Sequence, residues 1–218
     1  SGLVWFVLFG WLSDRIGRKR LILVGYALTL LLLFPLFRMI GGAANPGLSE
    51  AAERAPVVVS YGAGIDCAYD PFAKAQANDC SRLLDHLSKK GVAYTTSQGA
   101  ANAPLAISIG DRAVDPADRG AVDAALTGAG YDFAKVRPKG GGIAIILLGV
   151  LALSALSGAT YGPVAALLSE LFPARIRYSS MSIPYHIGTG YFGGFLPFIS
   201  QYIVARTGDP YAGLWYTM

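Results

Sequence analysis

Three long apolar runs with almost no internal charge constrain this chain more than any other feature. They lie at residues 21–40, 141–168 and 179–205. The first is 20 residues long, close to what a helix rising about 1.5 Å per residue needs to cross a hydrocarbon core of ~30 Å. We therefore predict three membrane-spanning helices.

Residues 41–140, between the first two runs, have a different composition. Charged residues return, and Gly, Ala, Asn, Asp and Pro become frequent. Short β-type runs alternate with helical spacing of apolar residues, which predicts a small α/β domain. We expect strands at 57–61, 105–109 and, more weakly, 92–96, and helices at 80–90 and 115–126.

The net charge of +4 does not predict a nucleic-acid-binding protein. The basic residues gather in short loops beside the apolar runs rather than on one face. Such loops are typical of membrane topology signals.

Residues 10–20, GWLSDRIGRKR, form a short charged stretch between apolar segments. We predict a tight basic turn at the cytoplasmic surface, because positive charge keeps short loops inside the cell. Gly10 and Gly17 would let the chain reverse, since glycine accepts positive φ. Asp14 precedes the next helix, where an anion is favoured. A plain topology anchor is the alternative, although an anchor needs only the charge.

A second string, ELFPARIRY, follows the second apolar run at residues 170–178. Pro173 should stop the preceding helix. Glu170 and Arg177 should bracket the turn as a charge pair, and Arg175 adds to its basic character. The loop is again expected to be cytoplasmic.

These two loops together predict an outside location for residues 41–140. This topology also places four basic residues outside the cell, against the rule that basic residues remain on the cytoplasmic side: Arg38, Arg137, Lys139 and Arg206. Cys67 and Cys80 both lie in this segment, on the oxidising side. A disulfide and a pair of free thiols remain equal alternatives, because spacing does not fix distance.

The string at 10–20 resembles the signature loop of the major facilitator superfamily of transporters. With its flanks YGPVAALL and SIPYHIG, the second string resembles the carboxy-terminal half of the metabolite:proton symporters. The resemblance implies an all-α membrane protein, a major facilitator fold fragment from the end of helix eight to helix eleven, with an inserted extracytoplasmic α/β segment. It also implies a cytoplasmic gate, formed by Gly10, Asp14, Arg15, Gly17 and Arg18.

The last apolar run holds the only deep ionisable side chain, His186. An intramembrane histidine suggests a proton site, although a neutral histidine bonded to a neighbouring helix explains it as well. Tyr161, Tyr185 and Gln201 could bond a polar substrate, but such tyrosines more often mark helix contacts. Glycine pairs at 158/162 and 190/194 favour close helix packing. Kinked helices that line a transport route are a compatible alternative, so the glycines alone do not decide between them.

Enzyme signatures are weak throughout. The Gly-x-Gly after Tyr61 lacks a third glycine, and no Walker-type Gly-Lys-Ser/Thr occurs. His86 with Asp85 and Cys80 falls short of a zinc site. We predict no enzyme, no cofactor and no metal.

The predicted organisation has three parts: residues 1–40 with a helix end, the loop and a spanning helix; 41–140 as the extracytoplasmic domain; and 141–218 with two spanning helices. Both ends look cut, so we expect a fragment that lacks the first half of the transporter. The expected function is proton symport of a small metabolite across the bilayer of the bacterial inner membrane, by a multi-pass protein. The alternative is a membrane-anchored extracytoplasmic module that senses a ligand or binds a partner.

Overall fold

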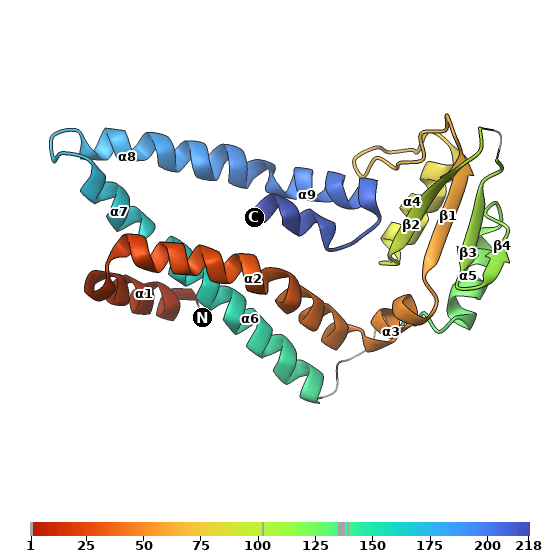
Figure 1. Ribbon diagram of the computed structural model, residues 1–218, viewed down its shortest axis with the longest axis horizontal. Helices are drawn as coiled ribbons and strands as arrows, with labels where there is room; N and C mark the ends of the chain where they lie inside the picture. Colours follow the sequence, from red (N-terminus) through yellow and green to blue (C-terminus); the bar gives the residue numbers. More distant parts are fainter. Residues whose placement is uncertain (1, 102, 135–137, 139) are drawn as a thin grey trace. The chain divides into compact units, whose positions relative to one another are not determined.

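The computed structural model describes residues 2–101, 103–134, 138 and 140–218. It divides into two compact units (Figure 1). The first comprises Ser1–Ile40, Lys139–Pro197 and Met218, and the second comprises Gly41–Pro138 and Phe198–Thr217. Arg137 and Lys139, two of the basic residues that run against the topology rule, lie outside the described residues.

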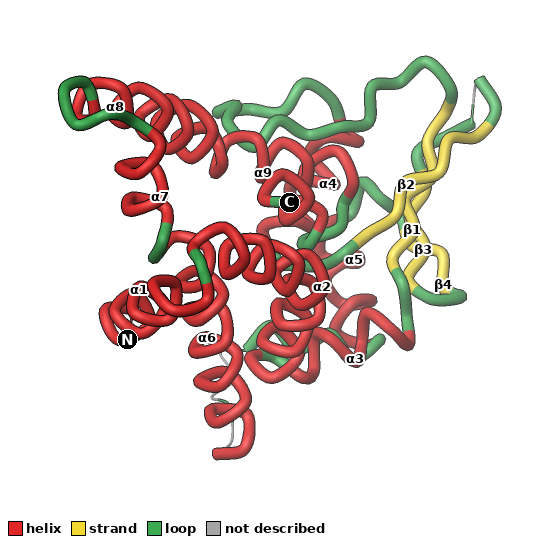
Figure 2. Tube along the Cα trace, turned by 60° about the vertical axis from the view of Figure 1, so that its left-hand side comes forward, coloured by secondary structure: helices red, strands yellow, loops and turns green. Residues whose placement is uncertain are grey.

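The first unit is helical. Its elements are α1 (Gly2–Ile16), α2 (Arg18–Ala44), α6 (Gly140–Tyr161), α7 (Val164–Leu171), α8 (Arg177–His186), the π-helix η1 (Ile187–Gly193) and the start of α9 (Gly194–Thr207). Both Figure 1 and Figure 2 show α1, α2 and α6 side by side.

Small residues bring α6 against its two neighbours. A Cβ on Gly158 would lie 2.7 Å from the Cβ of Trp5 on α1, which leaves no room for a side chain. A Cβ on Gly25 of α2 would lie 3.3 Å from Ala159. At Gly190 and Gly194, by contrast, a Cβ would meet nothing within 4 Å in the described part of the chain. Close helix packing therefore accounts for Gly158 and leaves the 190/194 pair unexplained.

Two helical segments within the described residues are long and apolar enough to cross a membrane, Arg18–Ala44 and Gly140–Leu171. They match the first two predicted spans. The third predicted span, residues 179–205, is helical but is not among them. It divides into α8, η1 and α9, and α8 carries the polar sequence RYSSMSIPYH.

The charged stretch at 10–20 is more helical than we predicted. α1 continues to Ile16 and α2 starts at Arg18, so only Gly17 interrupts the helices. Gly17 has φ +94°, the conformation that favours glycine. Gly10 lies inside α1, and among the described residues a Cβ at that position would meet nothing within 4 Å beyond the adjoining helix backbone. One residue, rather than a loop, reverses the chain.

The second unit contains a four-stranded mixed sheet in the order β2-β1-β3-β4. β1 (Val57–Gly62) runs parallel to β2 (Tyr94–Gly99) and antiparallel to β3 (Ala106–Ile109), which pairs with β4 (Arg112–Val114). α4 (Asp79–Lys89) connects the two parallel strands, as such a crossover requires. The remaining elements are α3 (Pro46–Arg54), α5 (Arg119–Gly128), the end of α9, and the 3₁₀-helix η2 (Ala212–Thr217).

The core of this unit lies between one face of the sheet and helices α4 and α5. Its largest buried members are Val57, Val59, Leu83, Leu84, Leu87, Ile107, Val122, Leu126 and Tyr131. Val57 pairs with Ile109 and Val59 with Ile107, so the buried positions of both strands share a face. Every predicted strand and helix of the segment occurs near its predicted place. The helix α3 and the three-residue β4 were not predicted.

Side chains cap and tie the two core helices. Asn78 accepts a hydrogen bond from the Ser81 amide at 2.8 Å, which caps the start of α4. Asp123 on α5 contacts His86 at 2.8 Å and Lys90 at 2.7 Å. Burial alone would raise the pKa of Asp123, but these two bonds outweigh it and lower that pKa below its ordinary value.

A disulfide joins Cys67 to Cys80 in the structure, with Cα atoms 5.2 Å apart. Both residues are buried, and they close the loop between β1 and α4. This is the first of the two alternatives that the sequence left open.

We expect Gly17→Ala and Gly10→Ala to act in opposite directions on stability. Alanine at position 17 would be forced to positive φ, at a cost of about 1–2 kcal/mol. Alanine at position 10 should stabilise the helix interior by ~0.5–1 kcal/mol. The measurement is the thermal unfolding midpoint of the detergent-purified protein, and equal midpoints for the two variants would contradict the backbone assignment.

We also expect no reactive thiol in the oxidised protein. Alkylation under denaturing conditions without reductant should leave the mass unchanged, whereas alkylation after reduction should modify both cysteines. Replacing both by serine should lower the free energy of unfolding by about 2–3 kcal/mol, because the bond constrains the unfolded loop. Two thiols alkylated before reduction would contradict the disulfide.

Candidate functional site

Arg18 lies at the centre of an ion-pair cluster in the first unit. Its guanidinium is 3.1 Å from the carboxylate of Asp14 and 2.7 Å from that of Glu170. Asp14 belongs to the last turns of α1, Arg18 begins α2, and Glu170 lies near the end of α7. The cluster therefore joins the two strings that the sequence singles out.

The local backbone explains why Arg18 can reach both acids. Gly17 reverses the chain at positive φ, and its amide still bonds the carbonyl of Ser13 at 3.0 Å. The hydroxyl of Ser13, which is buried, donates to the carbonyl of Gly10. These bonds fix the junction, so Asp14 and Arg18 stand four residues apart across it, within ion-pair reach.

The solvent exposure of the three side chains allows the ion pairs of the cluster to separate easily. Arg18 is 24% exposed, but Asp14 is 61% exposed and Glu170 56% exposed. Ion pairs with so much water contact contribute about 0–1 kcal/mol each. Such a cluster can hold two elements together and release them at small cost.

Arg15 and Arg177 take other partners. The Arg15 guanidinium stacks over the Trp11 ring, 4.1 Å from its centroid. Arg177 donates to the carbonyl of Phe172 at 3.3 Å. The expected pair of Glu170 with Arg177 therefore needs correction: Glu170 pairs with Arg18, because α7 ends close to the start of α2. Sequence spacing carries no signal for that contact.

The second string connects α7 to α8. α7 ends at Leu171 and α8 begins at Arg177, so Pro173 and Arg175 lie in the connection, both exposed. Pro173 lies two residues after the last residue of α7, in agreement with the inability of proline to continue a helix.

The remaining candidate residues lie elsewhere. His186 ends α8 and is exposed, and its ring meets that of Tyr185 edge-on with centroids 5.9 Å apart. Tyr161 ends α6 and is also exposed. Gln201 lies on the part of α9 that belongs to the second unit. Among the described residues, no group of three or more His, Cys, Asp and Glu side chains could hold a metal ion.

Comparison with known proteins finds similarity to transporters. The chain is 38% identical over 66 residues to the citrate-proton symporter of Klebsiella pneumoniae. It is 35% identical over 72 residues to the inner membrane metabolite transport protein YhjE of Escherichia coli (strain K12). It is 29% identical over 72 residues to a Staphylococcus aureus (strain COL) protein named for proline/betaine transport. About a third of the chain is therefore similar to proteins named as transporters, in agreement with the resemblance of its two strings to the major facilitator superfamily.

These matches are partial. They cover 30% of this chain and 15% of the citrate-proton symporter, and 33% of this chain and 16% of each of the other two. No protein-family model matches the chain, and the comparison with solved structures gave no significant match. All three relatives are named as transporters rather than enzymes, in agreement with the sequence analysis.

The contact of Arg18 with Glu170 predicts energetic coupling between these two residues. In a double-mutant cycle of Arg18→Gln and Glu170→Gln, we expect a coupling of about 0.2–1 kcal/mol in the free energy of unfolding. The matched control is the cycle of Arg15→Gln with Glu170→Gln, where coupling should be near zero because Arg15 stacks on Trp11. Equal coupling in the two cycles would contradict the assigned pair.

Proposed function

We propose that this chain is part of a secondary active transporter that moves a small metabolite across the bacterial inner membrane by proton symport. The observation that carries the proposal is the Arg18 cluster, which unites the two strings that resemble the superfamily. The names of the relatives support an organic acid or an osmolyte as the solute. The two long apolar helices support a membrane location.

In this proposal the protein spans the membrane several times and works with the first half of the transporter. Residues 1–40 and 141–218 form its membrane part, and residues 41–140 form an extracytoplasmic domain, against which residues 198–217 pack. The Arg18 cluster then lies at the cytoplasmic surface, because short segments rich in Arg and Lys, such as residues 10–20 and 170–178, remain on that side of the membrane.

The cluster would act as the cytoplasmic gate. Asp14, Arg18 and Glu170 hold helix ends together in one state, and separation of the pairs opens the path in the other. The junction between α1 and α2 is shaped by Gly10, Gly17 and Arg15. The connection between α7 and α8 is oriented by Arg175 and Arg177. Because the acids are more than half exposed, a few kcal/mol of solute binding suffices to shift the equilibrium.

His186 is the proposed proton carrier, because it is the ionisable side chain that the sequence places deepest in the last apolar run. Tyr161, Tyr185 and Gln201 are proposed as hydrogen-bonding groups for the solute.

A second candidate function places the activity in the second unit, as a ligand-sensing module on a membrane anchor. A cavity of about 460 Å³ in that unit favours it. In this case the protein would bind a ligand without moving it.

The deciding experiment is uptake by the full-length protein in proteoliposomes with an inward proton gradient. We expect concentrative uptake that a protonophore abolishes. Asp14→Asn should lower the rate by up to about fivefold, because the lost ion pair contributes no more than ~1 kcal/mol to the gating equilibrium. The matched control, Asp111→Asn in the exposed turn between β3 and β4, should transport normally.

Several outcomes separate the two functions. Binding without flux in the intact protein favours the anchored module. Uptake that survives deletion of residues 42–137 makes the extracytoplasmic domain accessory. Unchanged pH dependence in His186→Gln would remove that residue from the proton path.

A further inference from the structure

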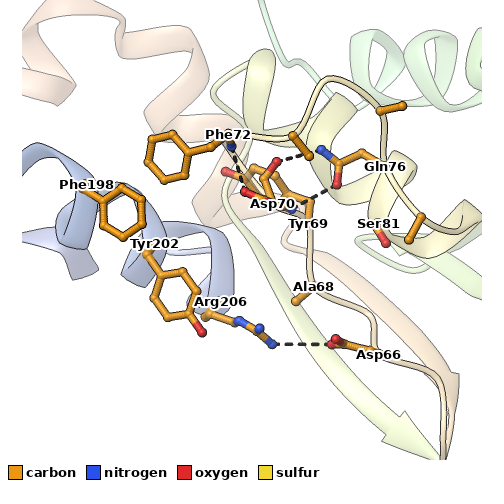
Figure 3. A pocket seen from close by; sticks show the side chains of 13 residues that line it. Asp66, Ala68, Tyr69, Asp70, Phe72, Gln76, Ser81, Phe198, Tyr202 and Arg206 are labelled. Carbon is orange, nitrogen blue, oxygen red and sulfur yellow. Dashed lines mark hydrogen bonds and ion pairs between the residues drawn. The ribbon is translucent and has the colours of Figure 1, made fainter.

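A cavity of about 460 Å³ lies within the second unit, beside the disulfide-closed loop. One wall is formed by residues 66–77 of that loop and by Ser81, and the other by Phe198, Tyr202 and Arg206 of α9 (Figure 3). The α9 residues are spaced four apart, so they share one face of the helix. The volume falls in the range of ~300–1,000 Å³ that small-molecule sites occupy.

The loop wall is held in place by the disulfide and by hydrogen bonds within the loop itself. The disulfide anchors both of its ends. Gln76 bonds the amide and the carbonyl of Asp70, at 3.0 and 2.8 Å, and Asp70 accepts from the Phe72 amide at 2.8 Å. A preformed wall lowers the ordering cost of binding a ligand.

Aromatic rings and carboxylates give the cavity features that attract a cation. The rings of Phe72 and Phe198 stack with centroids 4.6 Å apart. Asp66 and Asp70 stand on the same loop, and Tyr202 lines the opposite wall. Aromatic faces next to acids bind quaternary or protonated amines.

Arg206 adds a site for an anion. Its guanidinium lies 3.4 Å from Asp66 and 5.3 Å from the ring centroid of Tyr202. The two charged side chains are 48% and 78% exposed, so their pair is weak and a competing carboxylate can replace Asp66. A guanidinium accepts a carboxylate through two parallel hydrogen bonds.

We propose that this cavity binds a small zwitterion that carries both a carboxylate and a quaternary or protonated amine. The carboxylate of the ligand pairs with Arg206 in place of the carboxylate of Asp66. The freed Asp66 then pairs with the amine, and the second carboxylate oxygen of Asp70 and the outer faces of the stacked Phe72 and Phe198 rings line the same cavity. Binding replaces the single pair of Arg206 with Asp66 by two pairs, one between Arg206 and the ligand carboxylate and one between Asp66 and the ligand amine. Both charges of the ligand are therefore needed.

The test is isothermal titration of the purified full chain in detergent, with glycine betaine as the zwitterion. Choline has the same cation without the carboxylate, and acetate has the carboxylate alone. We expect glycine betaine to bind at least about tenfold more tightly than either, which corresponds to ~1.4 kcal/mol. Absence of saturable binding, or choline binding as tightly as glycine betaine, would overturn the proposal.

Variants assign the two charges of the ligand. Arg206→Gln should weaken glycine betaine binding about tenfold and strengthen choline binding, because it frees Asp66. Asp66→Asn should weaken choline binding and strengthen acetate binding, because it frees Arg206. Phe72→Leu should weaken choline and glycine betaine while leaving acetate unaffected.

Arg54→Gln is the matched control, because Arg54 is an exposed arginine paired with Glu50 at 3.8 Å on α3 and does not line the cavity. It should bind glycine betaine like the unmodified protein. An equal loss in Arg54→Gln and Arg206→Gln would overturn the proposal. If Arg206→Gln unfolds by circular dichroism, Arg206→Lys, which keeps the charge but loses the paired donors, replaces it and must also bind more weakly.

This proposal does not depend on transport. Binding is measured on the purified protein without a gradient, so a failure of proton-driven uptake leaves it intact. Conversely, a failure to bind glycine betaine leaves the gate at Arg18 untouched.

Discussion

The close contact of α6 with α1 and α2 is the interaction on which the Arg18 cluster depends. Gly158 lies against Trp5, and Gly25 lies against Ala159, at positions where a Cβ would be crowded. This contact fixes where α6 ends, and α7 follows after two residues. Glu170 on α7 consequently reaches the first residue of α2. A larger side chain at position 158 would move the acid away from its arginine.

The two units are stabilised by different physical means. In the first, helices satisfy their own backbone hydrogen bonds and expose many large apolar side chains, which suits a lipid environment. In the second, apolar side chains of α4 and α5 are buried against one face of a sheet, as in a water-soluble domain. The Cys67–Cys80 bond adds a covalent constraint to the loop that leaves the sheet.

Both sites rest on ion pairs that water reaches. Arg18 with Glu170 and Arg206 with Asp66 each include a carboxylate that is more than half exposed. Pairs of this kind contribute little to stability, but they exchange partners easily. Exchange is what a gate and a zwitterion site both require, whereas a deeply buried pair would resist separation.

The sequence by itself determined the elements that depend on local pattern. The apolar runs at 21–40 and 141–168 predict two helical segments that the structure contains. Short β-type runs predict β1, β2 and β3, and helical spacing of apolar residues predicts α4 and α5, because both signals act along the chain. The short β4 escaped prediction because its three residues are defined by pairing with β3. Tertiary structure alone decided two contacts. Glu170 pairs with Arg18 rather than Arg177, and residues 66–77 meet α9. Those contacts join segments far apart in sequence, and packing, not local propensity, brings them together.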